Sequence, residues 1–281
     1  MTSRNLSIKE GWRVLATTLA AVLLLAACAA PAGPTSTSAN ATPGESRDRL
    51  TASDEPESIK RARVRMELAS AYFSRGQLTT ALDEVKMAIV ADPNMGSAFN
   101  LRGLIYASLG DHRLAEESFR HALMLDARDV DTMQNFGWYL CQQKRFDEAE
   151  TLFNQALAVP HYRDSPRTLM TQGICHARAG RWPEAERALQ RSYELDPANP
   201  TTAVNLTEVL YRRGDLERAR FYIRRVNSST ELVNAQTLWL AARVEHKLGN
   251  RQGEQEFGAQ LRNRFPQSRE AAALDQGRFD D

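Results

Sequence analysis

The sequence repeats itself with a period of about 34 residues, and this period constrains the fold more than any other feature. Pairs of small residues twelve positions apart recur along the chain: Ala69/Ala81, Gly103/Ala115, Gly137/Ala149, Gly173/Ala185 and Thr207/Ala219. Successive pairs are separated by 34, 34, 36 and 34 residues. A unit of this length cannot bury an apolar face alone, so several units must stack on one another.

Each unit has the pattern of two antiparallel helices joined by a short turn. Its long stretches rich in Ala, Leu, Arg and Glu favour helix. We expect the small residues to let the two helices approach closely, with Phe119, Phe153 and Leu189 filling the space between them. Glycines in the left-handed conformation are expected to end the first helix of five units, at Gly76, Gly110, Gly180, Gly214 and Gly249.

The period, the small residues, an aromatic residue and a closing proline resemble the tetratricopeptide repeat (TPR). The resemblance implies an all-α, right-handed superhelical solenoid of about six helix-turn-helix repeats in residues 58–270, with a tail at 271–281. The expected repeats lie near 62–95, 96–129, 130–165, 166–199, 200–234 and 235–268, the last of them degenerate.

The resemblance also implies a concave groove, lined mainly by the first helix of each repeat. The partner-binding candidates at the matching positions are Met66, Phe73, Asn100, Leu104, Gln134, Trp138, Met170 and Ile174. The last two repeats present charge instead, at Glu208, Arg212, Arg243, His246 and Lys247. An apolar stripe of this shape suits an amphipathic helix or an extended segment of a partner. Trp138 is the expected main contributor, whereas Leu104 and Ile174 have packing between repeats as an alternative role.

Residues 1–27 have the pattern of a targeting segment, with a basic start and the apolar run VLATTLAAVLLLA. The segment ends in Leu25-Ala26-Ala27-Cys28, which resembles the bacterial lipobox and implies lipidation of Cys28. The alternative is an ordinary secretory signal. Ala29, where many inner-membrane lipoproteins have Asp, favours the outer membrane. Residues 28–57 are rich in Ala, Pro, Ser and Thr and are expected to form a flexible tether. We therefore expect a lipid-anchored protein of the outer membrane that faces the periplasm.

No catalytic or metal-binding motif is found in the sequence. None of the five histidines pairs with another at metal-ligand spacing, and no HExxH, CxxC, GxSxG or phosphate-binding glycine loop occurs. The formal net charge of +1 gives no reason to expect nucleic acid. We expect a protein-binding module that is monomeric, without enzymatic activity, cofactor or metal.

Cys141 and Cys175 lie on the first helices of repeats three and four, 34 residues apart, where the local repeat offset is 36. A lipoprotein signal implies an oxidising compartment, in which nearby thiols tend to pair. Cysteines that face inward on closely packed helices meet the Cα separation of a disulfide. We therefore predict a disulfide bond between them, with two independent buried thiols as the alternative.

Two stretches indicate a narrower family. The sequence NFGWYLCQQKRFDEAETLFNQAL, followed by a P-x-Y, contains Asn135, Gly137, Trp138, Leu140 and Cys141, and QGICHARAG surrounds Cys175. Both resemble the third and fourth repeats of the type IV pilus biogenesis and stability lipoproteins, the PilF/PilW family. The resemblance implies a pilotin that binds a secretin subunit and promotes its outer-membrane localisation and multimerisation. The alternative is a general cell-envelope scaffold, for peptidoglycan synthesis or outer-membrane protein assembly.

Overall fold

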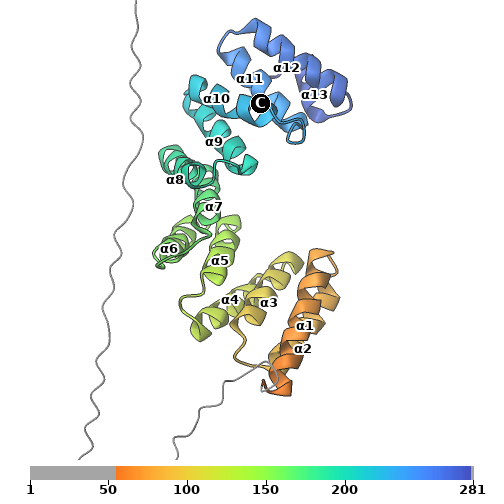
Figure 1. The fold of residues 1–281 in the computed structure, drawn as a ribbon, viewed down its shortest axis with the longest axis vertical. Helices are drawn as coiled ribbons and strands as arrows, with labels where there is room; N and C mark the ends of the chain where they lie inside the picture. The colour runs from red at the N-terminus through yellow and green to blue at the C-terminus, as the bar shows by residue number, and fades with distance from the viewer. Residues whose placement is uncertain (1–54, 280–281) are drawn as a thin grey trace, which may run out of the picture. The chain divides into compact units, whose positions relative to one another are not determined.

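The computed structural model describes residues 55–279, and this part of the chain contains thirteen helices and no strand (Figure 1). The first helices of the six antiparallel pairs are α1 (Glu57–Ser74), α3 (Gly96–Leu109), α5 (Val130–Gln142), α7 (Ser165–Arg178), α9 (Pro200–Arg213) and α11 (Ala235–Lys247). Their partners are α2 (Leu78–Ala91), α4 (His112–Leu125), α6 (Phe146–Leu157), α8 (Trp182–Leu195), α10 (Leu216–Asn227) and α12 (Arg251–Arg264), and α13 (Arg269–Asp275) follows. The predicted all-α repeat solenoid is confirmed.

Small residues set the distance between the two helices of a pair. A Cβ atom on Gly103 would lie 2.7 Å from the ring of Phe119, and one on Gly137 would lie 2.9 Å from the ring of Phe153. Both rings are fully buried. The glycines therefore provide space that the aromatic residue of the partner helix fills.

The turn inside each pair needs one residue in the left-handed conformation. The five predicted glycines all have positive φ, between 71° and 80°. In the third repeat Lys144 takes this conformation instead, with a φ of 61°. Its amide donates to the carbonyl of Cys141 at 3.0 Å, and the amide of Arg145 donates to that of Leu140 at 2.9 Å. The same turn geometry therefore forms without glycine.

The repeats stack through their first helices and through the second helix of the preceding repeat. Most connections between repeats have four residues. The predicted longer connection after the third repeat is present, at residues 158–164 between α6 and α7. A second long connection, residues 228–234 between α10 and α11, was not expected from the sequence.

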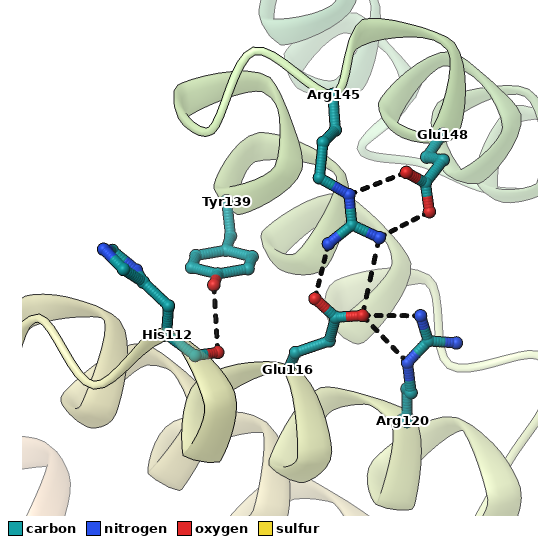
Figure 2. Close-up of polar contacts among 6 residues, drawn as sticks. All are labelled: His112, Glu116, Arg120, Tyr139, Arg145 and Glu148. Atoms are coloured by element: carbon teal, nitrogen blue, oxygen red, sulfur yellow. Dashed lines mark hydrogen bonds and ion pairs between the residues drawn. The ribbon is translucent and has the colours of Figure 1, made fainter.

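A polar cluster joins the second and third repeats (Figure 2). Glu116 of α4 binds both Arg120 of its own helix and Arg145, which also binds Glu148 at 2.6 Å. The hydrogen bond from Arg145 is the main cause that holds the pKa of Glu116 below its ordinary value.

Beside this cluster, the hydroxyl of Tyr139 on α5 donates to the backbone carbonyl of His112, the first residue of α4, at 3.0 Å. These contacts fix α5 against α4.

The same clamp recurs along the solenoid. Glu150 of α6 binds Arg181 at 3.0 Å, and Glu186 of α8 binds Arg218 at 2.5 Å. Each acid lies on the second helix of one repeat, and each arginine lies at or near the start of the second helix of the next. Solvent screens pairs at this exposure, so each adds little to stability, and their effect is on the orientation of neighbouring repeats.

The repeat domain extends further than the predicted boundary at residue 270. Helix α13 spans that boundary, and its Ala271 and Leu274 are buried. Leu274 packs beside Gly258 of α12, and Phe279 beyond α13 is also buried. The predicted tail is thus largely part of the fold, because α13 covers apolar surface that the last repeat would otherwise expose.

The predicted targeting segment, Cys28 and the tether up to residue 54 lie outside the described residues. Within residues 55–279, no helix has both the length and the hydrophobicity needed to cross a bilayer.

Candidate functional site

Helices α5 and α7 enclose a hollow of about 230 Å³ on the face formed by the first helices. We call it the α5–α7 hollow, and its lining residues are Gln134, Asn135, Trp138, Arg167, Met170, Thr171 and Ile174. The structure therefore brings together four of the eight predicted groove residues: Gln134, Trp138, Met170 and Ile174.

Trp138 is the largest side chain of the α5–α7 hollow. It is half-buried and packs against the cluster formed by Phe136, Leu140 and their neighbours. The guanidinium of Arg178, from α7, lies 4.6 Å from the centre of its ring. This cation–π contact and the packing behind the ring hold the indole in place. A pre-ordered aromatic surface loses little conformational entropy when a partner binds.

Gln134 lies at the base of the hollow, and its side-chain oxygen is already engaged. It is 5% exposed and accepts hydrogen bonds from the hydroxyls of Tyr162, at 3.2 Å, and Thr168, at 2.9 Å. Burial raises the pKa of Tyr162. Tyr162 comes from the long connection between α6 and α7, so Gln134 links that connection to both helices. The tyrosine of the P-x-Y stretch is the signal for this contact in the sequence, but the repeat pattern does not place it at the hollow.

Asn100 and Leu104, the two candidates on α3, join repeats rather than line the hollow. Asn100 is 9% exposed, and its side-chain oxygen accepts a hydrogen bond from the amide group of Asn135 at 3.2 Å. Leu104 is half-buried against the same cluster that supports Trp138. Ile174 also packs on a core cluster, but it lines the hollow as well. The packing contacts of the alternative role are thus present for both Leu104 and Ile174, and their part in partner binding stays a prediction.

The remaining candidates, Met66 and Phe73, are half-buried on α1 and pack on the first core cluster. They are not among the residues of the α5–α7 hollow. The structure thus brings four of the eight candidates together in one hollow, and a role of the other four in partner binding stays a prediction.

Cys141 of α5 and Cys175 of α7 are placed as a disulfide pair directly behind the hollow. Their Cα atoms are 5.8 Å apart, and the side chains are 1% and 4% exposed. The bond would connect the two helices that supply the walls of the site. His176, next to Cys175, is 7% exposed, and this burial is the main cause that lowers its pKa.

The chemistry of the hollow is that of recognition. Its lining combines an indole, two aliphatic side chains, two amides, a hydroxyl and one guanidinium. Within residues 55–279, no three His, Cys, Asp or Glu side chains gather in a way that could hold a metal ion. The lining can bury an apolar side chain of a partner and hydrogen-bond the groups beside it.

Comparisons with known proteins agree with this architecture. Tetratricopeptide-repeat family models match residues 94–160, 135–200 and 176–232. The chain is 25% identical over 205 residues to the type IV pilus assembly protein PilF of Pseudomonas aeruginosa. The matching region covers 73% of this chain and 81% of PilF. The solved structure of that bacterium's PilF superimposes with a TM-score of 0.67 at 23% identity and covers 79% of this chain and 100% of the PilF chain.

The crystal structure of PilW, described as a widely conserved type IV pilus biogenesis factor, is similar enough to this chain to show its family. It superimposes with a TM-score of 0.70 at 31% identity and covers 76% of this chain and 97% of the PilW chain. The two cysteine-containing stretches had already indicated the same group. The chain therefore belongs to the PilF/PilW family of tetratricopeptide-repeat proteins of type IV pilus biogenesis.

Proposed function

We propose that the protein is a pilotin for type IV pilus biogenesis. In this proposal it binds a secretin subunit in its groove and promotes the localisation of that subunit to the outer membrane and its multimerisation there. Its action is binding, without catalysis. The relationship to PilF and PilW supports the place in pilus biogenesis.

The observation that carries the binding site is the α5–α7 hollow with Trp138 on its wall. A half-exposed indole backed by a packed cluster is the kind of residue that dominates binding at an interface. Trp138, Met170 and Ile174 give the hollow apolar groups, and Asn135, Arg167 and Thr171 add polar groups to its lining. This combination fits a secretin segment that inserts one large apolar side chain and hydrogen-bonds beside it.

Lipidation of Cys28 is the proposed source of the membrane address. Several acyl chains on one cysteine anchor a protein firmly, since each buried methylene contributes about 0.8 kcal/mol. Metabolic labelling with a palmitate analogue should label the wild-type chain and not the Cys28→Ser variant, and that variant should leave the outer-membrane fraction. A variant that keeps both the label and the location would contradict this anchor.

The decisive test replaces the chromosomal copy with Trp138→Ala. Truncation of a dominant interface residue costs roughly 2 kcal/mol or more, about a 30-fold weaker complex. We expect fewer detergent-resistant secretin multimers on immunoblots and fewer surface pili, at an unchanged level of the folded protein. Phe221→Ala is the matched control, because Phe221 is a 59% exposed aromatic residue on α10, outside the α5–α7 hollow.

Deletion of the whole gene separates this proposal from the general envelope scaffold. A pilotin deletion should abolish secretin multimers while the rest of the envelope stays intact. Normal multimers and pili, together with defects in peptidoglycan or outer-membrane proteins, would reject the pilotin in favour of the scaffold.

A further inference from the structure

The segment that follows α13 returns to the first helices of the last two repeats. Phe279 is 8% exposed, and its ring stacks on His246 at 3.8 Å between centres and lies 5.2 Å from Trp239. Its carbonyl oxygen accepts hydrogen bonds from Nε of Arg243, at 3.1 Å, and from the hydroxyl of Tyr211, at 3.3 Å. Both the side chain and the backbone of one residue are therefore recognised.

Two of the residues that hold Phe279 occupy the same positions in their repeats as residues of the α5–α7 hollow. At the repeat spacing, Trp239 corresponds to Gln134 and Met170, and Arg243 corresponds to Trp138 and Ile174. The chain's own C-terminal segment thus lies on the face where a TPR solenoid receives peptides. It does so two repeats away from the α5–α7 hollow.

The surroundings of Phe279 combine aromatic rings with charged side chains, and Arg243 and His246 are paired with Glu208 at 3.6 Å and Glu254 at 3.0 Å. The guanidinium of Arg243 lies 4.5 Å and the ammonium of Lys247 lies 4.7 Å from the centre of the Tyr211 ring. In the sequence two aspartates, Asp280 and Asp281, follow Phe279 and lie outside the described residues. The chemistry of the site suits an aromatic residue that adjoins acidic ones.

Helix α13 does not depend on this contact for its own position. Ala271 and Leu274 are 2% and 7% exposed, and Leu274 packs against α12 beside Gly258. The chain then passes through Gly277, whose φ is 65°, before it reaches Phe279. The amides of Gly277 and Arg278 donate to carbonyls of α13, at 3.0 and 2.9 Å, so only Phe279 lies beyond the cap of this helix and is held by α9 and α11 alone.

We propose that the face formed by Tyr211, Trp239, Arg243, His246 and Lys247 is a second peptide-binding site. Its ligand is a partner segment with an aromatic residue next to acidic residues, and the chain's own Phe279 occupies the site as a displaceable substitute. The proposal does not rest on secretin binding, because it concerns different repeats and different chemistry.

The test measures binding of a fluorescein-labelled synthetic peptide of residues 277–281 to the full chain by fluorescence anisotropy. In the wild-type chain the tethered segment competes with the peptide, whereas Phe279→Ala removes the competing ring. We expect Phe279→Ala to bind the peptide at least tenfold more tightly than the wild type and than the Phe221→Ala control. Adding Trp239→Ala to Phe279→Ala should abolish binding, and a peptide that itself carries Phe279→Ala should not bind.

Three outcomes would overturn the proposal. One is no binding of the peptide to the Phe279→Ala chain, and another is equal binding of the two peptides. The third is loss of cooperative unfolding, measured by circular dichroism, both in Phe279→Ala and in a chain ending at Gln276, since the segment would then be a permanent part of the core.

Discussion

Gly137 shows how a single residue determines the spacing within a repeat. A Cβ atom there would lie 2.9 Å from the ring of Phe153, which is fully buried. Overpacking of this kind costs about 1–3 kcal/mol, so we expect Gly137→Ala to lower the free energy of unfolding by that amount in urea titrations. The control is Gly96→Ala, whose new Cβ would have its nearest neighbour at 3.7 Å. Equal stability of the two variants would show that the glycine does not set the spacing.

His176 gives the domain a dependence on pH. It is 7% exposed on α7, and burial lowers its pKa, with Glu150 and Arg181 as nearby charges of opposite sign. As the pH falls below about 6.5, the ordinary value for histidine, the unfolded chain takes up a proton that the folded chain does not. The free energy of unfolding should therefore decrease from pH 7.5 to pH 5.5. Urea titrations of His176→Gln should show a smaller decrease, and the same decrease as the wild type would count against His176 as the cause.

The positions of side chains that follow from the repeat pattern were predictable, whereas contacts specific to this chain were harder to predict. Trp138, Met170 and Ile174 were placed in the groove because the repeat register determines which face they occupy. Gln134 has the right register, but its oxygen is taken by Tyr162 and Thr168. The repeat register predicts which face of a helix a side chain occupies. It does not predict hydrogen bonds to the irregular connection between α6 and α7, because the path of that connection does not recur from repeat to repeat.

At the scale of helices, α5 and α7 form the unit on which the proposed binding depends. The predicted bond between Cys141 and Cys175 would close a loop across 34 residues and connect the two walls of the hollow. Such a cross-link contributes about 2–4 kcal/mol. We expect the double variant Cys141→Ser, Cys175→Ser to lose stability by this amount and to bind the secretin less well, because the walls are no longer fixed.

The bond itself is tested by peptide mapping of the protein purified from cells without reducing agent. A peptide pair that contains both cysteines is the expected product, and reduction should separate the pair. Two alkylated thiols in the unreduced sample would contradict the bond, and the double variant would then have no cross-link to lose.

The helix pairs could be predicted because the repeat period specifies both the apolar face of each helix and the turn within each pair. Features that depart from the period were missed. Lys144 adopts the left-handed backbone conformation that glycine adopts in the other repeats, and the residues around Lys144 do not predict it. The connection at 228–234 was missed because the last repeat matches the pattern poorly. Helix α13 was missed because it covers the end of the stack instead of repeating it.

At the scale of the whole molecule, the groove changes character along its length. The α5–α7 hollow is lined by an indole, two aliphatic side chains and several polar ones, whereas the face of α9 and α11 combines aromatic and charged side chains and holds the chain's own Phe279. The recurrent clamps, of which Glu116 with Arg145 is one, keep successive repeats in one orientation. The two faces lie on different repeats, and they differ in the ligand chemistry that they suit.

Within residues 55–279 the two ends of the solenoid differ in what covers them, and this predicts an asymmetry in local unfolding. In the described residues only α2 and α3 contact α1, whose Val64 and Leu68 are 54% and 38% exposed. The other end is covered by α13. In a stack of repeats each unit is stabilised mainly by its neighbours, so an uncovered end opens at a lower free energy. Hydrogen exchange followed by mass spectrometry should therefore show faster exchange in α1 and α2 than in α11 and α12.

A chain that ends at Ser268 tests the role of α13 directly, because it lacks this helix. In that shorter chain α11 and α12 should exchange faster than in the full chain. Unchanged exchange in that shorter chain would mean that α13 does not stabilise the last repeat, and that the difference between the ends comes from the repeats themselves.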